Sequence, residues 1–264
     1  MRDLVPPTPP DNQGDGRLRI FDQPAIDGRA ERGIVPQQLD GHPVSELQEL
    51  LEDMSAEESI GWVLDRFGRR AMIASSFQKT GSVVVDIASR VDANARFFYV
   101  DTDVLFKETY ETRDALEKRY GITFERYAGI SLEEQAEKHG ANLWARQPDA
   151  CCGIRKVEPM REALIGARCW VAGVRRSDSQ ARSKTPKFAW DRRFGLWKLN
   201  PLADWSDDQI WNHIRENDVP YNELHHQGFP SIGCTHCTRP VTGGEDDRAG
   251  RWAGFDKTEC GING

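Results

Sequence analysis

Residues 70–103, RAMIASSFQKTGSVVVDIASRVDANARFFYVDTD, carry the pattern that decides the fold. An apolar segment at 70–77 runs into a turn of small residues, and a second apolar segment at 96–103 ends in acidic and hydroxyl side chains. The residues between them, 82–91, predict a helix despite the strand preference of their consecutive valines. A strand, a helix and a strand at this spacing predict an α/β fold, in which a parallel sheet has helices on both faces.

The same alternation continues on both sides of this stretch. Two helices are expected before it, from Ser45 and from Ser55, because Gln48 and Glu58 complete capping boxes three residues later. Further helices are expected at 107–121, 131–140, 151–166 and 206–217, and further strands at 122–128 and 169–174. The expected organisation is a disordered or loosely ordered leader at 1–43, one domain at 44–245, and a mobile, flexible C-terminal tail at 246–264.

Three loops follow the predicted strands, at 75–82, 101–106 and 173–182. The carboxyl ends of parallel strands lie at one edge of a sheet, and ligands bind beyond that edge. We therefore expect the three loops to line a single crevice. Ser75, Ser76, Phe77 and Arg175 are candidate substrate-binding residues in these loops.

The composition limits the possible partners and the compartment. The net charge is −7, from 35 basic and 42 acidic residues, so general binding to nucleic acid is not expected. Basic residues are nevertheless concentrated at 173–184 and 247–252. Local basic patches on an acidic protein suggest a small anionic ligand, although each patch by itself is more typical of solvated surface charge. The first sixteen residues lack the apolar core of a secretory signal, and no apolar run is long enough for a membrane span. A cytoplasmic protein is expected.

The six cysteines fall into three groups. Cys169 lies in an apolar segment and is expected to be a small buried hydrophobe. Two pairs, one adjacent and one in CTHC, could supply four thiolates to zinc or to an iron–sulfur cluster, or could remain free thiols. These pairs are Cys151 with Cys152 and Cys234 with Cys237. Cys260 stands alone near the chain end, where it is either an incidental surface thiol or a functional one.

The cysteine motifs together resemble a known enzyme family. CCGIRK at 151–156, CTHC at 234–237 and ECG at 259–261, with GVRRSDSQAR at 173–182 between them, are similar to the cluster-containing adenylyl-sulfate reductases of assimilatory sulfate reduction. The resemblance extends from about residue 45 to the C-terminus. It implies an adenine nucleotide α-hydrolase-like fold and reduction of adenosine 5′-phosphosulfate (APS) to sulfite and AMP. The implied electron donor is thioredoxin or glutaredoxin, and we also expect a homo-oligomer.

The resemblance also implies roles for individual residues. Cys260 matches the catalytic cysteine, and Lys156 matches a lysine between the cluster and the substrate. The implied cofactor is a [4Fe–4S] cluster held by Cys151, Cys152, Cys234 and Cys237. The matching substrate-binding positions are Gly173 and Arg182 at the adenosine and Arg248 and Arg251 at the phosphosulfate.

This chemistry suits a thiolate at the end of the chain. The Cys260 thiolate would attack the sulfate sulfur after nearby cations have neutralised the anionic oxygens, giving a Cys260 S-sulfonate. A thiolate of thioredoxin would then attack Cys260 and release sulfite. A mobile tail would let Cys260 serve both partners in turn. In this scheme the cluster is structural and electrostatic, because thioredoxin supplies both electrons.

Two residues depart from the family pattern. Asn263 stands where the family tail commonly carries histidine. Lys79 is either surface charge or a cation that binds a 3′-phosphate. The second role would shift the substrate preference to 3′-phosphoadenosine 5′-phosphosulfate (PAPS). Two other classes are open: a related sulfur-transfer adenylating enzyme, which normally has a glycine-rich SGGxDS loop, and a non-enzymatic module stabilised by zinc.

Overall fold

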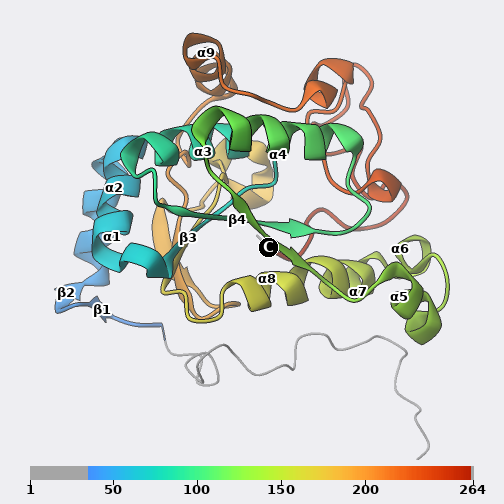
Figure 1. Ribbon diagram of the computed structural model, residues 1–264, viewed down its shortest axis with the longest axis horizontal. Helices are drawn as coiled ribbons and strands as arrows, with labels where there is room; N and C mark the ends of the chain where they lie inside the picture. The colour runs from blue at the N-terminus through green and yellow to red at the C-terminus, as the bar shows by residue number, and fades with distance from the viewer. Residues whose placement is uncertain (1–34, 263–264) are drawn as a thin grey trace, which may run out of the picture.

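A six-stranded sheet forms the centre of the protein (Figure 1), for which a computed structural model describes residues 35–262. The strands are β3 (Ala71–Ala74), β4 (Arg96–Asp101), β5 (Phe124–Ala128), β6 (Cys169–Val171), β7 (Phe188–Asp191) and β8 (Leu196–Leu199). Their order in the sheet is β5-β4-β3-β6-β8-β7, and every neighbouring pair is parallel except β7 with β8. The predicted parallel α/β sheet is confirmed, with an antiparallel edge strand that the sequence analysis missed.

Helices cover both faces of the sheet. One face packs against α1 (Val44–Asp53), α2 (Ala56–Phe67), α3 (Lys79–Val91), α4 (Lys107–Tyr120) and α9 (Asp207–Asn217). The other face packs against α8 (Glu158–Ala163), which continues α7 (Pro148–Cys152) through a π-helical turn, η4 (Gly153–Val157). Figure 1 shows α3 and α4 on one side of the sheet and α7 and α8 on the other. The shorter elements are β1 (Gln38–Leu39), β2 (His42–Pro43), α5 (Leu132–His139), α6 (Leu143–Arg146), η3 (Gly68–Arg70), η5 (Arg176–Asp178), η6 (Gln180–Arg182), η7 (Glu223–Gln227) and η8 (Thr235–Cys237).

The helix α3 forms although its sequence contains consecutive valines. Val83, Val84 and Val85 are all fully buried, because α3 lies between the sheet and the helices α2, α4 and α9. Burial of three such side chains is worth several kcal/mol, which exceeds the few tenths lost per residue in helix propensity. Tertiary packing therefore determines that this segment is helical. The helix begins at Lys79, three residues before its predicted start.

The capping predictions gave one correct and one wrong result. Ser55 accepts a hydrogen bond from the Glu58 backbone, and the Glu58 carboxylate accepts one from the Ser55 backbone, so this capping box is confirmed. The box from Ser45 to Gln48 is wrong, because α1 begins one residue earlier and has no side-chain cap. The Gln48 amide instead donates to the carbonyl of Phe188 in β7. The β1–β2 hairpin leads directly into α1 and leaves no N-cap position for Ser45.

The sheet changes direction between β3 and β6. From β3 the chain continues outward through β4 and β5, and it then returns to place β6 on the opposite side of β3. The loops that leave β3 and β6 therefore diverge and open a crevice between them. Gly173 permits their close approach, because a Cβ atom there would lie 3.2 Å from the backbone nitrogen of Gly81 in α3.

Some sequence predictions concern residues outside 35–262. Residues 1–34 of the predicted leader and Asn263 lie outside the described residues, whereas 38–43 form the β1–β2 hairpin. Within 35–262, no helix combines the length and apolar character required to span a bilayer.

The two serines give a matched test of the capping result. Ser55→Ala should lower the free energy of unfolding by about 1 kcal/mol, because it removes a helix N-cap. Ser45→Ala should change it by less than about 0.5 kcal/mol, because Ser45 caps nothing. Urea unfolding measures both, and equal losses for the two variants would contradict the assignment.

Candidate active site

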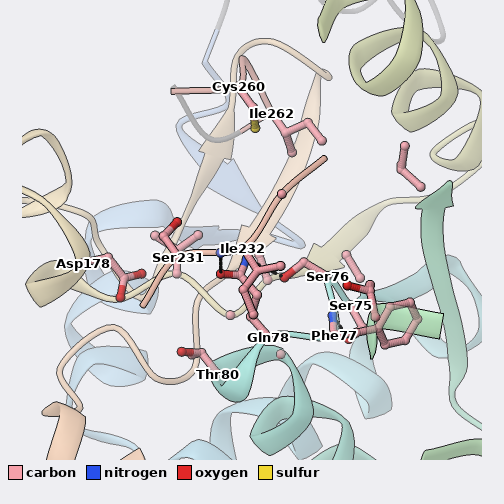
Figure 2. Close-up of a pocket in the computed structure, with 18 of the residues that line it drawn as sticks. Ser75, Ser76, Phe77, Gln78, Thr80, Asp178, Ser231, Ile232, Cys260 and Ile262 are labelled. Atoms are coloured by element: carbon pink, nitrogen blue, oxygen red, sulfur yellow. Dashed lines mark hydrogen bonds between the residues drawn. The ribbon is translucent and has the colours of Figure 1, made fainter. Parts of the chain in front are cut away.

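A cavity of about 230 Å³ lies in the crevice beyond β3 and β6. All ten of the catalytic and substrate-binding residues predicted from the sequence line it: Ser75, Ser76, Phe77, Lys156, Gly173, Arg175, Arg182, Arg248, Arg251 and Cys260. Figure 2 shows Cys260 and Ile262 on one side of this pocket and the loop from Ser75 to Thr80 on the other. The fold therefore gathers residues from the first loop, the third loop and the C-terminal segment around one space.

The loop after β3 is held in a strained conformation. Phe77 has a φ of +57°, which is uncommon for a residue other than glycine. The Ser75 hydroxyl accepts a hydrogen bond from the Phe77 backbone, and the ring of Phe77 packs edge-on against Tyr99 and Phe124 in the core. The Gln78 amide oxygen accepts a hydrogen bond from the Ile232 backbone, which joins this loop to the segment before Cys234 (Figure 2).

Two cations stand close enough to Cys260 to affect its ionisation. Burial by itself raises the pKa of the Cys260 thiol, but Lys156, the Ile262 backbone N–H and Arg251 outweigh it, so that pKa lies below its ordinary value. Within residues 35–262, neither Lys156 nor Arg251 forms an ion pair with a carboxylate. Their positive charge is therefore available to Cys260 and to an anionic ligand.

Lys156 occupies a position between two cavities. Its side chain is buried and lines both the pocket of Cys260 and a second cavity of about 260 Å³. The preceding residue, Arg155, fixes the π-helical turn by donating to the carbonyls of Thr102 and Ile130 and to Asp103. This network holds Lys156 in place from a different segment of the chain.

The second cavity brings the four paired cysteines together. Cys151 and Cys152 reach it from α7, and Cys234 and Cys237 reach it from the segment around η8. Within the described residues, no group of three or more potential ligands is arranged to hold a single metal ion. Cys169 is elsewhere, fully buried on β6, where burial raises the pKa of its thiol as expected of a structural cysteine.

The other predicted cations are already paired within the protein. Arg175 is buried and pairs with Asp178 and Asp207, each at 3.0 Å. Lys79 pairs with the same oxygen of Asp207 at 2.5 Å, so it is not a free surface charge. Asp207 is thus shared by two cations at the edge of the pocket.

Glu259 is a site residue that the sequence analysis missed. Its carboxylate pairs with both Arg182 and Arg248, and the Arg248 guanidinium also donates to the carbonyl of Thr258. These contacts dock the segment that carries Cys260 against the pocket. The ECG motif predicted a role for its cysteine and none for its glutamate.

Comparison with known proteins agrees with this geometry. Residues 70–240 match the family described as the phosphoadenosine phosphosulfate reductase domain. The chain is 43% identical to the adenosine 5′-phosphosulfate reductase of Oceanobacillus iheyensis, over 80% of this chain and 89% of that protein.

The chain belongs to the phosphoadenosine phosphosulfate reductase family.

Solved structures support the fold of this family member. A phosphoadenylyl-sulfate reductase of Candida auris, solved as a phosphate complex, is 31% identical with a TM-score of 0.67, and the match covers 76% of this chain and 98% of that one. The FMN adenylyltransferase of Candida glabrata is 15% identical with a TM-score of 0.53, over 77% of this chain and 69% of that one, and it shows the fold alone. The predicted fold class is thereby confirmed.

His225 is a second pocket residue of this reductase-family chain that was missed. Its Nδ1 lies 2.9 Å from the carbonyl of Phe229, to which it must donate, so Nε2 carries no proton and accepts from the Lys79 backbone N–H. This neutral ring satisfies a donor at the start of α3. Burial, followed by the charge of Lys79, lowers the pKa of His225 to about 4, with a smaller lowering from His226 and an opposing effect from Asp207.

This depressed pKa predicts a loss of stability in mild acid. Between pH 6.5 and pH 4 the unfolded chain binds a proton at His225 and the folded chain does not, so stability falls as pH falls through this range. The wild type should lose about 1–2 kcal/mol more than His225→Gln between pH 7.5 and pH 5. Urea unfolding at both pH values measures this, and identical losses would show that His225 is not held neutral.

Proposed function

We propose that this chain reduces APS to sulfite and AMP with Cys260 as the nucleophile. One observation carries the proposal: the Cys260 thiol, with its lowered pKa, shares a cavity with Lys156 and Arg251, two cations that have no carboxylate partner among the residues that the structure describes. The adenosine 5′-phosphosulfate reductases among its relatives support the same reaction, that of an oxidoreductase acting on a sulfur group.

The pocket also contains donors that an anion would satisfy. Within residues 35–262, the buried Nη1 atom of Arg175 and the buried Nε atoms of Arg248 and Arg251 have no hydrogen-bond partner. Buried donors are nearly always paired in native proteins, so unpaired guanidinium nitrogens beside a cavity favour an anionic ligand. A phosphosulfate supplies several anionic oxygens that a planar guanidinium can bind in pairs.

The first step is transfer of a sulfonate to Cys260. The thiolate attacks the sulfate sulfur of APS, a sulfur–sulfur bond forms, and the bond from that sulfur to the bridging phosphate oxygen breaks. AMP leaves with the bonding electron pair. Lys156 and Arg251 counter the repulsion between thiolate and sulfate and then stabilise the charge on the departing phosphate.

The second step uses a dithiol protein, thioredoxin or glutaredoxin. Its first thiolate attacks the Sγ atom of Cys260, and sulfite leaves with the electrons of the sulfur–sulfur bond. Its second thiolate then resolves the mixed disulfide and restores the Cys260 thiolate. Two electrons pass from the dithiol to sulfur, as the conversion of sulfate to sulfite requires. A tail that opens after sulfonation so that the dithiol protein can reach Cys260, a homo-oligomeric state and a cytoplasmic location are further expectations of this proposal.

The ion pairs at the pocket edge favour APS over PAPS. A 3′-phosphate needs an available cation. At this edge Lys79 is paired with Asp207, and Arg175 is paired with both Asp178 and Asp207, so a 3′-phosphate would have to compete with these carboxylates. Burial raises the pKa of Asp207, but Lys79 and Arg175 outweigh it and lower that pKa, so the carboxylate stays charged at neutral pH. PAPS reduction is the alternative that the same assay tests.

A [4Fe–4S] cluster fits the second cavity better than zinc. A zinc ion needs four sulfur ligands within about 2.3 Å of one point, and the described residues form no such group. The four thiols surround a shared cavity instead, as a larger all-thiolate cofactor requires. We propose that Cys151, Cys152, Cys234 and Cys237 hold the cluster, which would join two distant segments and supply negative charge beside Lys156.

The assay that tests the function measures sulfite release from APS and from PAPS with reduced thioredoxin. The wild type should release sulfite from APS at least tenfold faster than from PAPS, because Lys79 and Arg175 at the pocket edge are already paired with carboxylates. Cys260→Ser should lose all measurable sulfite release and keep its fold. No sulfite from either nucleotide with iron-replete protein would contradict the proposal, and faster release from PAPS would reverse the substrate assignment.

Metal analysis tests the cofactor separately. Protein purified without oxygen should be brown and contain about four iron atoms and about four sulfides per chain. Cys237→Ser should lose most of both, whereas Cys169→Ser should keep them, because Cys169 lies away from the cavity. One zinc per chain without sulfide would support the zinc-stabilised module instead.

A further inference from the structure

The carboxylate of Glu259 is held by two arginines from different segments. Its Oε1 accepts from Arg182 Nε at 2.9 Å, and its Oε2 accepts from Arg182 Nη2 at 2.7 Å and from Arg248 Nη2 at 3.1 Å. All three side chains are less than 15% exposed. Bidentate, charge-assisted pairs of this kind are among the stronger polar interactions in proteins, and poor access to water strengthens them further.

The same arginines also fix the backbone next to Cys260. Arg248 Nη2 donates to the carbonyl of Thr258 at 2.6 Å, so one guanidinium holds both the main chain and the side chain of this segment. Arg182 belongs to η6, 77 residues earlier in the chain, and is itself braced by Asp178. The residue immediately before Cys260 is therefore tied to two anchored positions at the pocket.

The cations around the pocket have different partners. Glu259 engages Arg182 and Arg248, while Lys156 and Arg251 have no carboxylate partner within residues 35–262 and lower the pKa of Cys260. The tail is thus docked without pairing Lys156 or Arg251, whereas the charge of Glu259 itself opposes these cations by raising the pKa of Cys260. A second ion pair of this segment, between Lys257 and Asp149, involves a largely exposed carboxylate and is weaker for that reason.

We propose that Glu259 is a positioning residue, whose ion pairs with Arg182 and Arg248 hold the C-terminal segment closed and set Cys260 beside Lys156 and Arg251 before any substrate binds. Its effect on sulfonation rests on the proposed function, whereas its effect on closure does not. Loss of the carboxylate would free the segment and also leave two nearly buried guanidinium groups facing each other without their shared anion.

Alkylation of Cys260 in the ligand-free holoenzyme tests closure. The probe is iodoacetamide, and mass spectrometry of the Cys260 peptide measures the alkylation rate. This rate is compared at its high-pH plateau, where the thiol is fully ionised. At this plateau the rate reports access and not thiol ionisation. Glu259→Gln should react about tenfold faster than the wild type, because the neutral amide keeps the shape of the carboxylate and loses its charge.

Two variants provide the controls. Glu259→Asp retains the charge and should lie much closer to the wild type than Glu259→Gln. Glu245→Gln removes a carboxylate that is also bidentate to an arginine, Arg239, but lies just before the C-terminal segment and outside the pocket, and this variant should alkylate at the wild-type rate.

A single-turnover assay with APS and no thioredoxin tests positioning. The rate of Cys260 S-sulfonation at saturating APS should fall about tenfold in Glu259→Gln, while the APS concentration at half-maximal rate should not rise. A plateau alkylation rate in Glu259→Gln equal to that of the wild type would overturn the proposal. If the wild type is not sulfonated by APS but the alkylation rates differ as expected, the proposed function falls and the role of Glu259 in closure stands.

Discussion

Electrostatic repulsion is the constraint on which this site depends. In the proposed reaction the Cys260 thiolate must approach the sulfur of a phosphosulfate anhydride whose negative charge is spread over its peripheral oxygens, and repulsion between like charges grows as water is excluded. Burial by itself would also raise the pKa of the Cys260 thiol and leave it protonated. Lys156 and Arg251 reverse both effects, because each is positive and neither is neutralised by a carboxylate in the part of the chain that the structure describes.

The fold brings these cations to Cys260 from separate parts of the chain. Lys156 lies in a π-helical turn that Arg155 fixes against the loop after β4. Arg251 packs so closely over Gly233 that any side chain at that position would displace its guanidinium. Gly173 lets the loop after β6 approach the start of α3 and close the other side of the crevice. A few close backbone contacts therefore position most of the charge in the site.

Local sequence signals predicted the residues of the site better than their partners. The loops after β3 and β6 follow clear strand patterns, and the resemblance carried by the cysteine and arginine motifs supplied most of the other positions, so the ten pocket residues could be named in advance. Glu259, His225 and the pairing of Lys79 with Asp207 were missed because each has a defining partner 77 to 146 residues away. The periodicity of a sequence contains no information about such long-range contacts. The strands β7 and β8 were missed because the charged residues 191–193 interrupt their apolar residues.

The pKa of the Cys260 thiol in the holoenzyme tests the electrostatic account most directly. It can be measured from the pH dependence of the alkylation rate on the Cys260 peptide, in the wild type and in Lys156→Met. The account predicts a wild-type pKa below that of an ordinary cysteine, and a higher pKa in Lys156→Met, where burial is less opposed. A wild-type pKa at or above the ordinary value would contradict it, because Cys260 would then lie in its pocket without effective help from the surrounding cations.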